Sequence, residues 1–193
     1  MQYVKEIFAH YDKKFIRVYQ AYNPTIANQA VKLQNFGESF NLNRMTWIKP
    51  SFLWLMYRSN WGTKKNQECI LSIDIHREVF DSLLAQAVLT SPDSSFSDGK
   101  EWEKQFNDTA VYCQFDPDRN INGNPINRSA IQIGVKGSAL SQFLDGIYRI
   151  EDLTPSVRKW NALRKNGKLN MKDLPVERLY PVNDRKIRNR LDM

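Results

Sequence analysis

The sequence predicts a single compact α+β domain, with a mixed central sheet and flanking helices. The length of 193 residues suits one domain, which would bury roughly 70% of the surface that its unfolded chain exposes. Segments typical of strands alternate with segments typical of helices, and no internal repeat or low-complexity segment interrupts them. We therefore assign residues 1–182 to one domain and residues 183–193 to a basic C-terminal tail.

Strands are expected where β-branched and aromatic residues gather, and helices where a capping residue or a proline opens a helical pattern. Residues 15–22, FIRVYQAY, predict the first strand, and Asn23-Pro24 opens a helix that runs to about Gln34. Further strands are expected at 69–75, 110–115 and 130–135, and further helices at 51–59, 77–88, 137–144 and 154–165. Residues 91–101 predict a surface loop, residues 116–127 a hairpin-like connection, and LPVERLYPV an extended segment before the tail.

Cysteine use and hydropathy point to a cytoplasmic protein. Cys69 and Cys113 lie in separate apolar stretches, which is typical of buried thiols in a reduced protein. The N-terminal segment MQYVKEIFAHYDKK lacks the apolar core of a signal peptide, and no run approaches the roughly 18 apolar residues of a membrane span. No membrane partner is expected.

Charge is distributed unevenly along the chain. The first 155 residues hold 17 basic and 17 acidic side chains, so the formal net charge of +7 belongs to residues 156–193. This asymmetry predicts an anionic partner, either DNA or RNA or a phosphorylated ligand. The residues expected to contact nucleic acid are Arg185, Lys186, Arg188 and Arg190. The alternative is a solvated basic tail that only aids solubility.

The stretch MTWIKPSFLWLMYRSNW, residues 45–61, contains three of the five tryptophans. A residue before proline favours extended backbone and a proline favours the first turn of a helix, so Lys49-Pro50-Ser51 predicts a helix N-terminus. Unpaired backbone N–H groups, the helix dipole, an ammonium and a hydroxyl would together attract a phosphate there. The following helix is apolar on nearly all sides, which predicts that it is buried and that its aromatics mainly pack.

Several common chemistries lack their sequence motifs. The chain has no phosphate-binding P-loop, no dinucleotide-binding glycine motif, no H-E-x-x-H, no paired C-x-x-C and no G-x-S-x-G. The chain has only two histidines, His10 and His76. Two other functions stay open. A metal-dependent nuclease could use Glu68, Asp74, Asp116 and Asp118, and a module without catalytic activity could stack single-stranded nucleic acid on its aromatic strands.

Five segments together resemble the family catalogued as domain of unknown function 4291. They are IRVYQAYNP from Ile16, MTWIKPSFLWLMYRS from Met45, CQFDPDR from Cys113, RSAIQIG from Arg128 and LPVERLYP from Leu174. The resemblance extends over residues 5–182, and the segments occur in the same order. The family's own name implies no function.

A more distant resemblance implies one. IRVYQAY is similar to the first strand of ADP-ribosyltransferase folds, and PVERLYP to the late strand that holds their catalytic glutamate. The resemblance implies an NAD-dependent transferase that needs no metal and modifies nucleic acid or a nucleotide-like acceptor. Glu177 would contact the ribose 2′-hydroxyl as nicotinamide leaves, and the NAD-binding residues would be Arg17, Tyr19, Lys49, Ser51 and Gln132. The sequence departs from that superfamily in lacking a clear Ser-Thr-Ser or Glu-X-Glu arrangement.

Four of these residues also have a purely structural interpretation. Arg17 could pair with a buried acid such as Asp74, and Glu177 could form only a local ion pair. Tyr19 could be a core aromatic, and Gln132 could be a core amide whose hydrogen bonds are satisfied within the protein.

Overall fold

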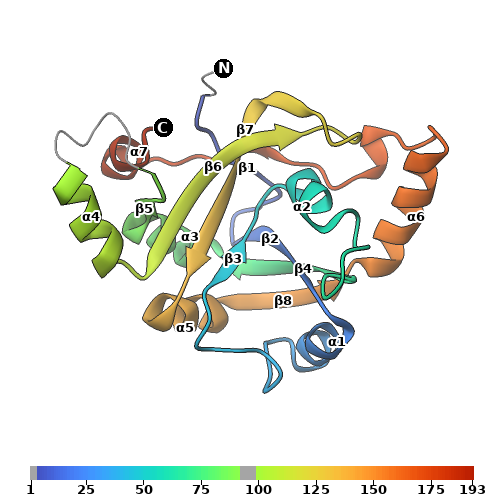
Figure 1. Cartoon of the computed structure of the whole chain (residues 1–193), viewed down its shortest axis with the longest axis horizontal. Coiled ribbons are helices and arrows are strands. Elements are labelled where there is room, and N and C mark those ends of the chain that lie inside the picture. The colour runs from blue at the N-terminus through green and yellow to red at the C-terminus, as the bar shows by residue number, and fades with distance from the viewer. Residues whose placement is uncertain (1–3, 92–98) are drawn as a thin grey trace.

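A computed structural model describes residues 4–91 and 99–193, and it confirms a compact α+β fold with mixed sheets (Figure 1). One antiparallel sheet has the order β2-β4-β8, formed by Phe15–Tyr22, Cys69–His76 and Ile147–Asp152. The second has the order β3-β7-β6-β5, formed by Thr46–Ile48, Pro125–Val135, Val111–Arg119 and Val88–Leu89, and its β5–β6 pair is parallel. A short ribbon pairs β1 (Phe8–Ala9) with β9 (Arg178–Leu179).

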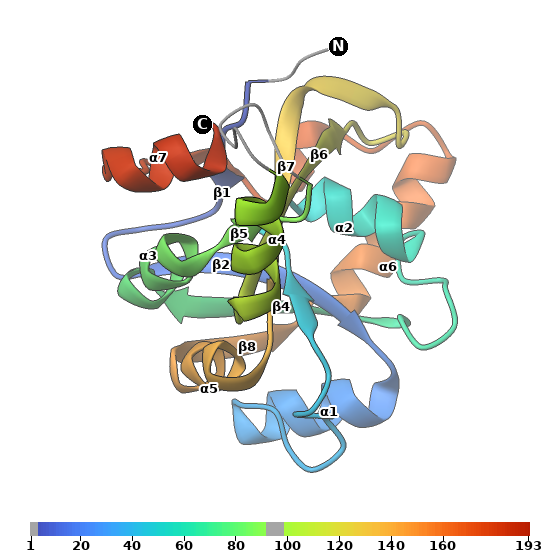
Figure 2. The ribbon, with the colours of Figure 1, turned by 60° about the vertical axis from the view of Figure 1, so that its left-hand side comes forward.

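Helices α1 and α2 begin after the capping residues that the sequence predicted. Asn23 caps α1 by accepting the N–H of Ile26, and Ser51 caps α2 by accepting the N–H of Trp54. The helices are α1 (Pro24–Leu33), α2 (Phe52–Ser59), α3 (Arg77–Gln86), α4 (Gly99–Asp108), α5 (Gly137–Asp145), α6 (Thr154–Lys165) and α7 (Arg185–Leu191), and a 3₁₀ turn covers Met171–Asp173. Helices α1 and α5 lie on the same side of β8 (Figure 2). Within the described residues, no helix has the length and apolar content needed to cross a bilayer.

The two large sheets meet near the start of α2. The N–H of Tyr19 on β2 donates to the carbonyl of Lys49, 2.8 Å away, just after β3 ends. The main core includes Val18 from β2 and Ile133 from β7. A second core cluster surrounds α2, whose Phe52, Leu53, Trp54, Leu55, Met56 and Ser59 are buried. The sequence-based expectation that this helix is buried is therefore confirmed.

Some elements differ from the sequence-based expectation. Of the predicted loop at residues 91–101, residues 92–98 lie outside the described residues, and Gly99 already begins α4. Helix α4 was not predicted, because its only apolar residues at helical spacing are Trp102 and Phe106, one turn apart. Their rings pack together with a centroid separation of 5.0 Å. Strand β8 was not predicted, because it is a half-exposed edge strand with few apolar positions.

The residues predicted to form a basic tail fold as helix α7. The side chain of Asp184 caps this helix, and Ile187 and Leu191 are buried in the main core. The basic residues of α7 do not share one environment, since Arg185, Lys186 and Arg188 are exposed whereas Arg190 is half-buried. Nη2 of Arg190 donates to the carbonyls of Leu84, at 3.2 Å, and of Ala85, which lie in the last turn of α3.

We expect the Arg190→Met substitution to lower the free energy of unfolding by about 1 kcal/mol, because Met keeps an apolar stem but cannot bond the last carbonyls of α3. The matched control is Arg188→Met, on the exposed side of the same helix, which should change stability by less than about 0.5 kcal/mol. Urea denaturation measures both. Equal values for the two variants would contradict a capping role for Arg190.

Candidate functional site

A cavity of about 840 Å³ lies between α2, the end of β2 and one face of the β6–β7 pair. The strand alternation of β6 places Gln114 and Asp116 on the same face, and Gln132 of β7 stands directly opposite Gln114 in the register. All three side chains line the cavity. Nε2 of Gln114 donates to Oδ1 of Asp116 at 2.9 Å, and Nε2 of Gln132 donates to Oδ2 at 2.6 Å. Asp116 is therefore held by one amide on each oxygen.

Lys49 also lines the cavity, just before the N-terminus of α2. Its backbone carbonyl is fixed by β2, and its Nζ donates to the carbonyl of Trp47 at 3.1 Å. Burial lowers the pKa of Lys49 to about 8, and the nearby charge of Arg58 contributes in the same direction. The ammonium form still predominates at neutral pH, but it is poorly solvated and would gain from an anionic ligand.

The rim of the cavity is basic. Arg44, Arg58 and Lys64 line it, and all three are exposed. Within the described part of the chain, none of these three residues and neither Lys49 nor Asp116 forms an ion pair. Four cations therefore accompany one carboxylate around the cavity, and the resulting positive potential favours an anionic ligand.

Two buried polar atoms on cavity-lining residues have no hydrogen-bond partner among the described residues. They are Oε1 of Gln20, an acceptor, and Nε1 of Trp54, a donor. The nitrogen of the same Gln20 amide is already bonded, since Nε2 donates to Oγ1 of Thr46 at 2.8 Å. Buried polar groups in proteins are nearly always hydrogen-bonded, so these two atoms are candidates to contact a polar ligand.

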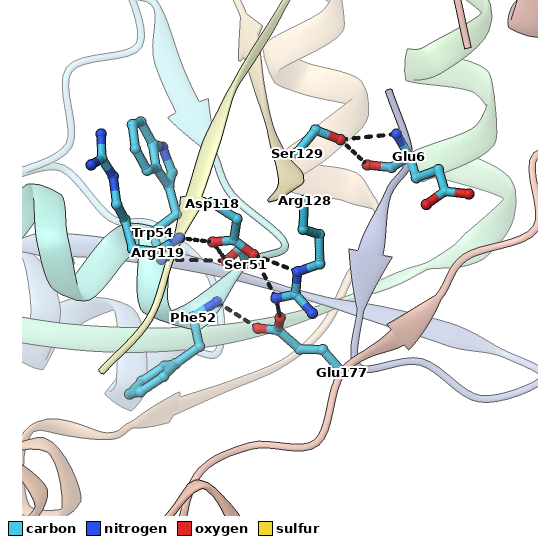
Figure 3. Close-up of polar contacts among 9 residues, drawn as sticks. All are labelled: Glu6, Ser51, Phe52, Trp54, Asp118, Arg119, Arg128, Ser129 and Glu177. Atoms are coloured by element: carbon cyan, nitrogen blue, oxygen red, sulfur yellow. Dashed lines mark hydrogen bonds and ion pairs between the residues drawn. The ribbon is translucent and has the colours of Figure 1, made fainter. Parts of the chain in front are cut away.

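A second polar cluster lies at the first turn of α2 and contains Glu177, Arg128, Asp118 and Ser51 (Figure 3). The N–H of Phe52 donates to Oε1 of Glu177 at 2.6 Å, and Nη2 of Arg128 donates to Oε2 at 3.0 Å. Nε of Arg128 donates to Oδ2 of Asp118 at 2.8 Å, and the Ser51 hydroxyl donates to Oδ1 at 2.8 Å. The side chain of Glu177 is 8% exposed and that of Asp118 is fully buried.

Burial raises the pKa of Glu177 to about 7, although its bonds with Phe52 and Arg128 favour the ionised form. The Glu177 carboxylate also occupies the N-terminus of α2, where the sequence predicted a ligand phosphate. The helix start thus attracts an anion as expected, but the anion belongs to the chain itself.

The structure does not bring all of the predicted NAD-binding residues together. Lys49 and Gln132 meet at the cavity, while Ser51 joins Glu177 in the second cluster. Arg17 lies outside both and forms a two-bond ion pair with Asp74, at 2.7 and 2.8 Å, as its structural interpretation predicted. Tyr19 is fully buried, with its ring 5.4 Å from that of Phe52.

Sequence reasoning missed several residues of the cavity. Gln114 was not singled out, Gln20 and Arg58 were not assigned to a ligand site, and Asp116 was considered only as a metal ligand. The QFD segment could have revealed Gln114 and Asp116, because it puts an amide and a carboxylate on the same side of a predicted strand. The role of Gln20 depends on the contact of β2 with β3, which no local pattern reveals.

The four carboxylates considered as metal ligands of a nuclease do not form one cluster. Asp116 lies in the cavity, Asp118 binds Arg128, Asp74 binds Arg17, and Glu68 accepts the N–H of Asn66. Across residues 4–91 and 99–193, no group of three or more His, Cys, Asp or Glu side chains is arranged to hold a metal ion.

Comparison with known proteins gives one assignment. A family model matches residues 6–180, which is most of the 193-residue chain and includes both the cavity and the Glu177 cluster. No curated protein matches the chain. Because the match covers far more than half of its length, the chain belongs to the family described as Domain of unknown function (DUF4291).

Proposed function

We propose that the protein binds NAD in the cavity and transfers its ADP-ribose to a nucleic acid or nucleotide-like acceptor. The observation that carries the proposal is the lining of the cavity, which combines amides, two tryptophans (Trp47 and Trp54) and four basic side chains. These four side chains form no ion pair with any residue that the structure describes. A dinucleotide offers phosphates, hydroxyls and aromatic bases to such a lining. The volume of about 840 Å³ also lies in the range of small-molecule sites.

In this reaction the bond between C1′ of the ribose and the nicotinamide nitrogen breaks, and nicotinamide leaves with the bonding electron pair. The acceptor forms the new bond to C1′ and releases a proton to solvent. Positive charge develops on the ribose ring, so a carboxylate held beside the ring lowers the barrier. Lys49 and Arg58 would fix the phosphates and so position C1′ for attack.

The resemblance assigns that carboxylate to Glu177, and we retain this assignment as part of the proposal. Both oxygens of Glu177 are engaged, one by the N–H of Phe52 and one by Arg128. Glu177 does not line the cavity, so contact with a ribose bound there requires its side chain to move and exchange these partners. Its raised pKa favours such an exchange, because the protonated form is held less strongly by Arg128.

Nicotinamide release from NAD tests the proposal, measured with and without a mixed pool of single- and double-stranded DNA and RNA. We expect release that depends on an added acceptor and that falls at least about tenfold in Lys49→Met, because a charge-assisted contact to phosphate is lost. The exposed Lys159→Met is the matched control and should match the wild type. Glu177→Gln should abolish release while leaving NAD binding intact. Absence of release from the folded wild type under every condition would overturn the transferase proposal.

The affinity for NAD should also depend on the protonation of Lys49. Because only the ammonium form attracts phosphate, we expect affinity to fall roughly tenfold as the pH rises from 7 to 9, through the lowered pKa of about 8. Calorimetric titration at several pH values measures this fall. The Lys49→Met variant should bind weakly with little pH dependence, and an equally steep fall in that variant would show that another group titrates.

A module that binds nucleic acid without catalysis is the second candidate, and one observation favours it. Arg185, Lys186 and Arg188 are exposed together on α7, whereas Arg190 is engaged with α3. Reversing the three exposed charges should weaken binding to single-stranded nucleic acid and reduce its salt dependence. Unchanged salt dependence in that triple variant would exclude α7 as the contact surface.

A further inference from the structure

We propose that Asp116 binds the 2′- and 3′-hydroxyls of a ribose, so that the cavity selects ribonucleotides over deoxyribonucleotides. This inference rests on the proposed function, in that it takes the ligand of the cavity to be a nucleotide. It adds the group that recognises the sugar, and it gives a role to a residue that neither the sequence motifs nor the distant resemblance assigned.

The two glutamines leave Asp116 with unused acceptor capacity. A carboxylate oxygen can accept about two hydrogen bonds, and each oxygen of Asp116 accepts one, from Gln114 or from Gln132. Both amides stand on paired strands in fixed register, so they hold the carboxylate in one orientation. Asp116 is half-buried and lines the cavity, which leaves room for two further donors, one on each oxygen.

The negative charge of Asp116 is available to a ligand in the cavity. The charge of Asp116 raises the pKa of Lys49, against the larger effect of burial, so the two groups interact through space. Among the described residues, however, no cation forms an ion pair with Asp116 at contact distance. Neutral amides orient the carboxylate without cancelling its charge. Hydrogen bonds to charged groups are the stronger class, so an oriented, unpaired carboxylate is well suited to hydroxyl donors.

The ligand group that suits this arrangement carries two adjacent donors and no positive charge. A guanidinium has the donors, but Arg44, Lys49, Arg58 and Lys64 around the same cavity would repel it. The vicinal diol of a ribose has both hydroxyls on one side of the ring and is neutral. In a ribonucleotide the diol is attached to phosphates that Lys49 and Arg58 can bind and to a base that Trp47 or Trp54 can contact.

Calorimetric titration with ADP, 2′-deoxy-ADP and 2′,3′-dideoxy-ADP tests the inference. The wild type should bind ADP about ten- to a hundredfold more tightly than dideoxy-ADP, with 2′-deoxy-ADP between them, since up to two charge-assisted hydrogen bonds are lost. Asp116→Asn should lose most of this preference, because an amide carries no charge and presents only one acceptor oxygen. The matched control is Asp108→Asn, which removes the same charge from an exposed position at the end of α4 and should keep the wild-type preference.

The outcomes separate this inference from the proposed function. Equal wild-type affinity for ADP and dideoxy-ADP would overturn the ribose contact while leaving a nucleotide-binding cavity. Tight binding of GDP and deoxy-GDP alike, with weak binding of ADP, would also overturn it, because Asp116 would then hold the paired N–H donors of a guanine. No binding of any nucleotide by the folded wild type would overturn both. The wild-type comparison needs no variant, so it decides the question even if Asp116→Asn does not fold.

Discussion

The Arg128→Met substitution is expected to lower the free energy of unfolding by about 3–5 kcal/mol, the largest effect that we predict for a single side chain. Arg128 is the only ion-pair partner of both Asp118 and Glu177 among the described residues. Asp118 is fully buried and Glu177 nearly so, and the N–H groups and the hydroxyl that remain around them carry no full charge. Removing the guanidinium therefore leaves two buried carboxylates close together without a counter-charge.

Urea denaturation at pH 7.5 measures this effect. Arg185→Met, on the exposed face of α7, serves as the control and should change stability by less than about 0.5 kcal/mol. The double variant Arg128→Met/Glu177→Gln should recover part of the loss, because one of the two uncompensated charges is then absent. A loss below about 1 kcal/mol for Arg128→Met would show that water or rearrangement already solvates these carboxylates.

The second large effect is a dependence of stability on pH that arises from Glu177. Its pKa in the folded protein is raised from 4.5 to about 7 by burial, so the folded state holds this proton more tightly than the unfolded state does. A raised carboxyl pKa stabilises the fold at pH values below about 4.5, and this contribution is lost as the pH rises to about 7. The shift corresponds to about 3 kcal/mol across that window.

Comparison with Glu177→Gln isolates this contribution, because the amide imitates the protonated side chain and does not titrate. The stability of the wild type relative to the variant should fall by about 3 kcal/mol between pH 4.5 and pH 8, as other titrating groups affect both proteins equally. Chemical denaturation across that range gives the difference. A relative stability that rises with pH would show that Arg128 and the helix start prevail over burial and hold the pKa of Glu177 below its ordinary value.

Local signals in the sequence were sufficient for much of the fold. The Asn23-Pro24 and Lys49-Pro50-Ser51 steps predicted the starts of α1 and α2 because capping and proline geometry depend on neighbouring residues only. Strands β2, β4, β6 and β7 were predicted because their apolar residues are dense. Helix α7 was not, since it has only Ile187 and Leu191 as buried residues and is otherwise strongly basic. Its packing depends on a distant core surface that the local sequence does not describe.

The candidate site was less predictable, because long-range contacts decide it. Lys49 was recognised from its position before Pro50, and the structure places it at the cavity. The same reasoning placed a ligand phosphate at Ser51, whereas Glu177, 125 positions away from Phe52 in the sequence, fills that place. Arg17 matched a motif position, but Asp74 on the neighbouring strand accepts hydrogen bonds from its Nε and Nη2. Which carboxylate meets which cation follows from sheet register, and a single sequence does not determine that register.

The β1–β9 ribbon has a consequence for the order in which the chain folds. It pairs Phe8 with Leu179, and the same two regions are joined by the bond between Lys5 and Asp192, which are 187 positions apart. Contacts between such distant positions require closing a very long loop before they contribute any stability, so they slow folding and tend to form late. We expect β1 to remain unpaired during synthesis until residues 178–179 emerge from the ribosome, and the last step of folding to be the joining of these two regions.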